Sequence, residues 1–207
     1  MSPEGGPVRW IGATTLGGAV GATVSTALLG TPGRPLATVA GGAVLVLAFG
    51  ALIGLVIGTS QLLMLPRRSE RWHAWILATT VGAALGFGLA AWVGEQLGNV
   101  IDPTISVAVG GAAIQITSGA AVGLGIGGGQ RLVLRRSFPE AHGWIVSTVI
   151  GAGLGYGAAI GMLELVNVPI LKANAILSFG AILGSFVGVA QSLVLWPRRR
   201  RLVPTGP

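Results

Sequence analysis

The sequence predicts an all-α integral membrane protein of six transmembrane helices, arranged as three tandem pseudo-symmetric helical hairpins. Three observations carry this prediction. Charged residues make up 9% of the 207 residues and hydrophobic residues 52%, whereas an ordinary soluble chain is about 25% charged. Long apolar segments alternate with short charged or Pro-rich ones. Equivalent Gly, Gln and Trp positions also recur three times along the chain.

Six segments are long and apolar enough to be membrane spans, because a helix needs about 20 mostly apolar residues to cross a hydrocarbon core of about 30 Å. They run roughly over Val8–Leu29, Leu36–Leu65, Trp72–Val93, Ser106–Leu134, Gly143–Val166 and Ala173–Leu195. We therefore predict a single membrane domain, 1–207, that ends in a short cytoplasmic tail, 202–207.

The basic residues gather on one side of this topology. With six spans, the side that holds both termini carries eleven of the 13 Lys and Arg residues: Arg9, Arg67, Arg68, Arg71, Arg131, Arg135, Arg136 and Arg198 to Arg201. The other side carries Arg34 and Lys172. Because short cytoplasmic loops are rich in Lys and Arg, both termini are predicted to be cytoplasmic.

This charge distribution also indicates the partners. Clustered arginines next to membrane spans attract anionic lipid headgroups. Recognition of a nucleic acid would need a basic face on a soluble domain, and the sequence contains no such domain. Membrane-protein partners or further copies of the chain are compatible with this architecture.

Three of the five Gln residues follow the same pattern of glycines. Each has Gly at positions −11, −7 and −3. The three sets are Gly50, Gly54 and Gly58 before Gln61; Gly119, Gly123 and Gly127 before Gln130; and Gly180, Gly184 and Gly188 before Gln191. Such a regular recurrence indicates an internal repeat.

A second pattern recurs in the odd-numbered spans. Each has a Trp followed by Thr at +4 and by Gly at +7 and +11. The sets are Trp10, Thr14, Gly17 and Gly21; Trp75, Thr79, Gly82 and Gly86; and Trp144, Thr148, Gly151 and Gly155. The two patterns define repeat units of approximately 8–68, 72–136 and 142–201, related about an axis along the membrane normal.

Helical geometry indicates what these patterns do. At about 100° per residue, each set lies on one stripe of its helix. Glycines allow two helix backbones to approach closely, which stabilises helix association in lipid. We therefore expect the stripes to be helix–helix contacts, with each Gln hydrogen-bonded to a hydroxyl, indole or carbonyl group of a neighbouring span. The alternative is that the three Gln residues form a polar ring along a path through the membrane.

Other polar residues are candidates for function. Glu95 and Glu164 each lie 20 residues after their Trp, at the outer interface, and a carboxylate at membrane depth is a candidate site unless it is solvated. Gln115 has no polar counterpart in the other two repeats, so it indicates either a ligand site or polar packing. His73 and His142 each precede a repeat Trp by two residues and are candidate haem, chlorin or metal ligands, or simply interfacial residues.

The chain lacks the groups that most catalytic sites need. It has no Cys, which excludes thiolate zinc sites, iron–sulfur clusters and Cys nucleophiles. It also lacks the common metalloprotease, hydrolase and β-lactamase motifs. We therefore expect no enzyme activity, no cofactor and no metal.

The repeated motifs resemble those of uncharacterised bacterial multi-pass membrane proteins. In those proteins Gly-x-x-Gln…Leu-Arg elements are followed by Trp…Ser/Thr…Gly elements. Here Gly58 to Gln61 with Arg67, and Gly127 to Gln130 with Arg135, look similar, and each is followed by its Trp. The resemblance covers nearly the whole chain and supports the architecture, but it implies no activity. It implies a bacterial cytoplasmic (inner) membrane as the location.

The favoured function is that of a non-enzymatic structural or accessory subunit, or a scaffold, of the cytoplasmic membrane. The chain has almost no soluble mass and no catalytic set of residues. The alternative is a small-solute or ion channel or carrier with a polar path at the three Gln residues.

Overall fold

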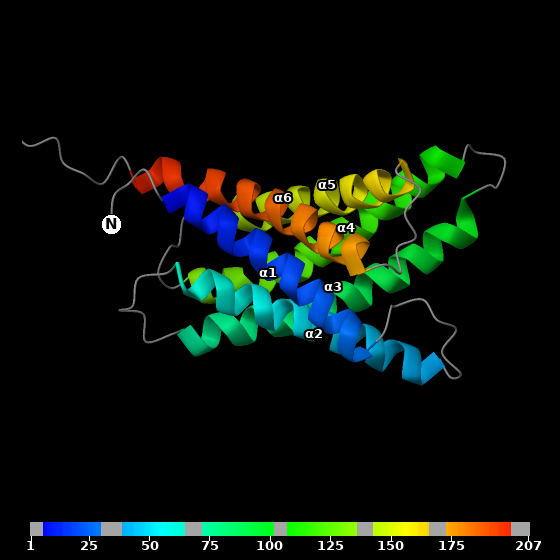
Figure 1. Ribbon diagram of the computed structural model, residues 1–207, viewed down its shortest axis with the longest axis horizontal. Helices are drawn as coiled ribbons and strands as arrows, with labels where there is room; N and C mark the ends of the chain where they lie inside the picture. Colours follow the sequence, from blue (N-terminus) through cyan, green and yellow to red (C-terminus); the bar gives the residue numbers. More distant parts are fainter. Residues whose placement is uncertain are drawn as a thin grey trace, which may run out of the picture.

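The structure is a computed structural model that describes residues 6–29, 39–64, 72–101, 107–135, 143–165 and 173–199. These residues form six helices and, within the described ranges, no strand. The helices are α1 (Gly6–Leu29), α2 (Val39–Leu62), α3 (Trp72–Val100), α4 (Val107–Leu134), α5 (Gly143–Leu165) and α6 (Ala173–Arg199). Successive helices run back and forth along one common direction (Figure 1).

Five of these helices are long and apolar enough to cross a membrane. They are α1, α2, α3, α5 and α6. In α4, many glycines together with Gln115, Thr117 and Ser118 interrupt the apolar sequence. The chain is thus an all-helical, multi-pass membrane protein.

The helix boundaries differ from the predicted spans mainly at two ends. α3 continues to Val100, past the predicted end at Val93, because Glu95 and Gln96 are good helix formers although they end the apolar run. α6 continues to Arg199 rather than Leu195. In both cases the helix extends beyond the apolar segment from which the span was predicted.

The six helices form a closed ring in chain order. Each helix contacts the next one, and α6 contacts α1. Every helix therefore packs mainly against two others and has one inward face and one outward face.

The glycines at −11, −7 and −3 from the three repeat glutamines lie at the contacts of α2 with α3, α4 with α5, and α6 with α1. A methyl group added at Gly54 would lie 2.6 Å from the carbonyl oxygen of Thr79. One added at Gly123 would lie 2.5 Å from that of Thr148, and Gly184 meets the carbonyl oxygen of Thr14 in the same way. These positions therefore require glycine for the observed helix separation.

The glycines at +7 and +11 from the three repeat tryptophans lie at the other three contacts: α1 with α2, α3 with α4, and α5 with α6. A methyl group added at Gly21 would lie 3.2 Å from the Cα of Ile53. A methyl group added at Gly86 would lie 2.8 Å from the carbonyl oxygen of Val122, and one added at Gly155 would lie 3.1 Å from the Cα of Leu183. The two glycine stripes predicted from the sequence thus occupy different, alternating contacts of the ring.

The outward face of the ring is apolar. Large hydrophobic side chains point outward from every helix, for example Leu16, Leu55, Leu85, Leu124, Leu154 and Leu193. In a soluble protein so many exposed leucines would be unusual, whereas in a bilayer they contact acyl chains.

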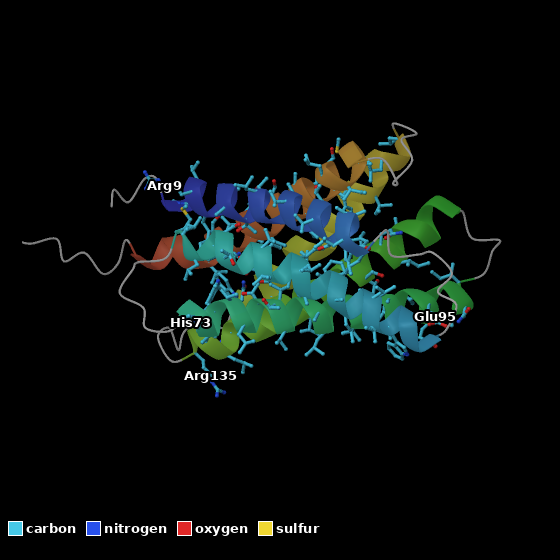
Figure 2. All side chains as sticks on the ribbon, turned by 60° about the horizontal axis from the view of Figure 1, so that its bottom comes forward. Arg9, His73, Glu95 and Arg135 are labelled. Atoms are coloured by element: carbon cyan, nitrogen blue, oxygen red, sulfur yellow. The ribbon has the colours of Figure 1, made fainter. Side chains whose placement is uncertain are left out.

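The two ends of the bundle differ in charge. Arg9, His73 and Arg135 lie at one end, and Glu95 lies at the other (Figure 2). We call the first the arginine end. Many of the predicted loop and tail residues lie outside the described residues, including Arg34, Arg67, Arg68, Arg71, Arg136, His142, Lys172, Arg200 and Arg201.

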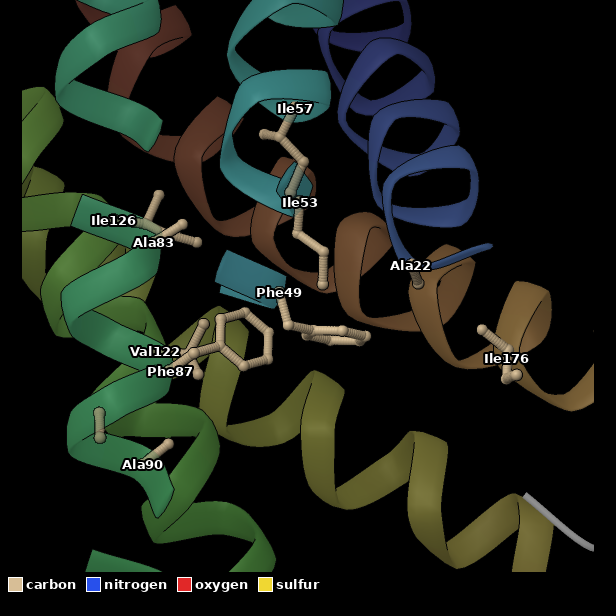
Figure 3. Packing of buried hydrophobic residues seen from close by; sticks show 11 residues of the cluster. Ala22, Phe49, Ile53, Ile57, Ala83, Phe87, Ala90, Val122, Ile126 and Ile176 are labelled. Atoms are coloured by element: carbon tan, nitrogen blue, oxygen red, sulfur yellow. The ribbon is translucent and has the colours of Figure 1, made fainter. Parts of the chain in front are cut away.

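Inside the ring, apolar side chains are stacked in layers. Counted from the arginine end toward the middle of the bundle, Ile57 and Ile53 of α2 come first, and an edge-to-face pair of Phe49 and Phe87 follows. The ring centroids of this pair lie 5.7 Å apart (Figure 3). Val122 of α4 belongs to the same cluster and is fully buried. This layered interior surrounds one polar layer, which lies closer to the arginine end.

Candidate functional site

Three glutamines, one from each even-numbered helix, meet inside the helix ring. Gln61, Gln130 and Gln191 are each 0% exposed, and we call them the glutamine ring. Gln130 Nε2 donates to Gln61 Oε1 at 2.8 Å, and Gln61 Nε2 donates to Gln191 Oε1 at 3.2 Å. Gln191 Nε2 closes the cycle by donating to Gln130 Oε1 at 3.0 Å.

A threonine of the adjacent odd-numbered helix accepts the second N–H of each amide. The Nε2···Oγ1 distances are 3.2 Å to Thr14, 3.2 Å to Thr79 and 3.1 Å to Thr148. Each threonine hydroxyl in turn donates to the carbonyl oxygen of the Trp four residues before it, at 2.8–2.9 Å. Because that donation uses the only hydroxyl hydrogen, each threonine can only accept from the amide.

The three repeat tryptophans lie beside the glutamine ring. Trp10, Trp75 and Trp144 contact one another edge to face, with centroid distances of 6.1, 6.1 and 6.2 Å. We call them the tryptophan triad. Trp10 Nε1 donates to Gln191 Oε1 at 3.3 Å, and Trp144 Nε1 donates to Gln130 Oε1 at 3.2 Å.

These contacts fix the orientation of the amides. An indole N–H can only donate, so it must face the amide oxygen, whereas the accepting threonine must face the amide nitrogen. Gln130 and Gln191 thereby use both N–H groups and both acceptor sites of their amides. The hydrogen bonds around the glutamine ring therefore run in one direction.

One hydrogen bond of the threefold pattern is missing. The buried indole N–H of Trp75 has no hydrogen-bond partner among the described residues. The other two Trp–Gln pairs indicate Gln61 Oε1 as the acceptor for this N–H. Among the described residues, Gln61 Oε1 accepts one hydrogen bond, from Gln130. The contact of α2 with α3 thus lacks the Trp–Gln bond that the two equivalent contacts contain.

The polar layer is enclosed by apolar side chains on both sides. Toward the arginine end, the tryptophan triad packs against Met64, Val133, Val194 and Leu134. Toward the other end, the next layer consists of Ile57, Ile126 and Val187, each less than 5% exposed. The glutamine ring and its threonines therefore form a single hydrogen-bonded layer between apolar layers.

The remaining predicted site residues do not join this layer. Glu95 is exposed near the end of α3, and His73 is exposed at the start of the same helix. Gln115 is half-buried on α4. Glu164 lies in α5, but its side chain is outside the described ones, and His142 is outside the described residues.

The layer contains no group that ionises near neutral pH. In the described part of the chain, the buried polar side chains belong to Thr, Ser and Gln. No group of three or more His, Cys, Asp and Glu residues that could hold a metal occurs among the described residues. The chemistry available at the site is hydrogen bonding.

The sequence patterns predicted an indole as a possible partner of each Gln, but they did not reveal that the three tryptophans contact one another. The repeat placed each Trp on the same stripe as its Thr, which was the available signal. Their mutual contact could not be read from one helix, because it depends on how the three odd-numbered helices are arranged around the ring.

Comparisons of the chain with protein-family models, with curated proteins and with solved structures find no match. The function is therefore argued from the geometry of this chain.

Proposed function

We propose that the chain is a non-enzymatic structural or accessory subunit, or scaffold, of a bacterial cytoplasmic membrane. In this proposal it consists of three tandem hairpins, α1–α2, α3–α4 and α5–α6, and all six helices span the bilayer. The observation that carries the proposal is the glutamine ring, whose hydrogen-bonding groups are used within the protein and which lies between apolar layers.

The sixth span is supported by the contacts of α4. Its glycines meet α5 at Gly119, Gly123 and Gly127, and Gly125 meets Gly82 of α3. A helix held along its length between two membrane spans shares their direction and depth. Since the even- and odd-numbered helices make equivalent contacts three times, the same geometry supports three hairpins related by a pseudo-threefold axis.

The orientation is supported by charge. Arg9, Arg131 and Arg135 belong to the side of the topology that holds both termini, and Glu95 lies at the opposite end. Arginines in short connections favour the cytoplasmic side, where they would contact anionic lipid headgroups. Labelling of single cysteines introduced at the two termini in intact spheroplasts tests this, because exposure of either terminus outside the cell contradicts it.

The alternative is a channel or carrier whose path runs through the glutamine ring. It is favoured by the position of three polar side chains inside the helix ring. It is opposed by their hydrogen bonding, because a permeating ion or solute would have to displace contacts among the Gln, Thr and Trp side chains. Apolar layers on both sides would also hold no water for the ion.

Flux measurements in proteoliposomes distinguish the two functions. For the scaffold, the permeability to protons, potassium and glycerol equals that of protein-free liposomes. For a channel, the flux exceeds that background, and replacing Gln130 by Leu changes it. Such a Gln130-dependent flux would overturn the scaffold and establish the alternative.

A further inference from the structure

Five of the six contacts between neighbouring helices in the ring contain a side-chain hydrogen bond. Where α1 meets α2, α3 meets α4 and α5 meets α6, a ring glutamine donates to a threonine of the other helix. Where α4 meets α5 and α6 meets α1, a repeat tryptophan donates to a ring glutamine. Between the described residues of α2 and α3 there is no side-chain hydrogen bond, so apolar packing holds this contact together.

Two buried donors on α3 are unpaired along this same contact. They are the indole N–H of Trp75 and the hydroxyl of Thr80, and neither has a hydrogen-bond partner in the described part of the chain. Thr80 lies against α2, since a methyl group added at Gly54 would lie 2.8 Å from its Cα. The contact of α2 with α3 therefore contains buried donors without acceptors.

The equivalent positions of another repeat explain why the Thr80 hydroxyl is unpaired. Thr15 occupies the same position of α1, and its hydroxyl oxygen lies 2.9 Å from that of Ser185 on α6, with which it shares a hydrogen bond. The repeat places Leu55 of α2 at the position of Ser185. A leucine side chain offers no acceptor, so Thr80 lacks the partner that Thr15 has.

In a bilayer, this difference decides which contact separates most easily. Lipid acyl chains are as apolar as leucine, so they replace apolar contacts between helices at little cost, but they cannot replace a hydrogen bond. Separating α2 from α3 breaks no side-chain hydrogen bond between described residues, and it lets two unpaired donors turn toward other acceptors. Separating any other neighbouring pair breaks at least one such bond.

We propose that the helix ring opens laterally between α2 and α3, so that this contact is a gate between the interior and the lipid. The opening lies in the half away from the arginine end, because the chain joins α2 to α3 at that end. It separates Phe49 of α2 from Phe87 of α3, which pack edge to face in the interior (Figure 3). The polar layer stays closed, because Gln61 is bonded to residues of α1, α4 and α6 and not to α3.

Pairs of spin labels at equivalent outward positions test this gate, because the chain has no cysteine of its own. The double variants are Leu47→Cys with Leu85→Cys across α2 and α3, Ile116→Cys with Leu154→Cys across α4 and α5, and Leu177→Cys with Val20→Cys across α6 and α1. All six side chains are exposed, so the labels lie outside the ring. Electron paramagnetic resonance in lipid nanodiscs gives the distance distribution of each pair from the dipolar coupling of its labels.

We expect the pair across α2 and α3 to show a second, longer distance that the other two pairs lack. Adding Leu55→Ser gives Thr80 the partner that Thr15 has, so it should lower the share of the longer distance at least about threefold, the effect of one hydrogen bond between membrane helices. The matched control is Leu124→Ser, at the equivalent position of α4, which faces Val149 of α5 rather than a threonine. It should leave that share unchanged.

Distributions of equal width in all three pairs would overturn the proposal. An equal effect of the two serine variants would also overturn it, because the unpaired Thr80 hydroxyl would then not set the opening. The gate leads to the lipid and leaves the polar layer closed, so its failure leaves the flux test of the scaffold unaffected.

Discussion

Replacing Gln130 by Leu should destabilise the protein strongly, because Gln130 makes four buried hydrogen bonds. It donates to Gln61 and Thr79 and accepts from Trp144 and Gln191. Leucine has a similar size but leaves the indole N–H of Trp144 and one amide N–H of Gln191 without an acceptor. Each unsatisfied buried donor costs about 1–3 kcal/mol, so two cost about 2–6 kcal/mol.

A second estimate agrees with the lower end of this range. Hydrogen bonds between membrane helices contribute about 0.6 kcal/mol each on average, so four contribute about 2.4 kcal/mol. We therefore expect Gln130→Leu to lower the free energy of unfolding by about 2–6 kcal/mol. Unfolding in mixed micelles with increasing SDS, followed by tryptophan fluorescence, measures this, because the tryptophan triad adjoins the glutamine ring.

The matched control is Gln115→Leu, on the same helix. Since the Gln115 amide has no hydrogen-bond partner among the described residues, this change should alter the free energy of unfolding by less than about 0.5 kcal/mol. A double-mutant cycle of Gln130→Leu with Thr79→Val isolates one bond and should give a coupling of about 0.6–1.7 kcal/mol. If Gln130→Leu is as stable as the wild type, or if the control is equally destabilised, the hydrogen-bonded layer does not stabilise the fold.

Three further outcomes are expected in the same assay. Replacing all three members of the glutamine ring by Leu should lower the free energy of unfolding by less than the sum of the three single changes. Each single change leaves an amide donor of a neighbouring Gln without an acceptor, and in the triple variant these donors are absent. Simple additivity would contradict this. Gly82→Ala should be strongly destabilising, since the added methyl group would meet the carbonyl oxygen of Gly125. Gly12→Ala, where nothing lies within 4 Å of the added methyl group, should be neutral or stabilising by up to about 1 kcal/mol. Equal effects at the two positions would refute the close-contact argument. Trp75→Phe should be less destabilising than Trp144→Phe by about one hydrogen bond, about 0.6–1.7 kcal/mol, and the reverse order would show that the Trp75 indole is bonded in the membrane.

Much of the helix content and of the inward stripes could be predicted from the sequence, because both follow from local spacing. The glycines before Gln130 and the glutamine itself lie on one face of a helix whatever surrounds it. Which neighbour each stripe meets is a property of the closed ring, so the separation of the two glycine sets into alternating contacts could not be predicted. The same holds for the tryptophan triad, which joins residues of three different repeats.

The spacing of the glycines also explains why a polar layer is useful in this fold. Because they recur every four residues, sliding a helix by one turn, about 6 Å, would bring Gly58 to the place of Gly54 against Thr79. Glycine contacts alone therefore do not distinguish two neighbouring registers, and apolar layers of similar residues distinguish them poorly. The polar layer does, because the same shift of four residues in α4 would put Leu134 in the place of Gln130 and leave the amide without its partners. A single buried polar position can fix the register of packed helices in this way. Here three equivalent positions do so together, because shifting any one of the three even-numbered helices would break the hydrogen bonds of its glutamine to the other two.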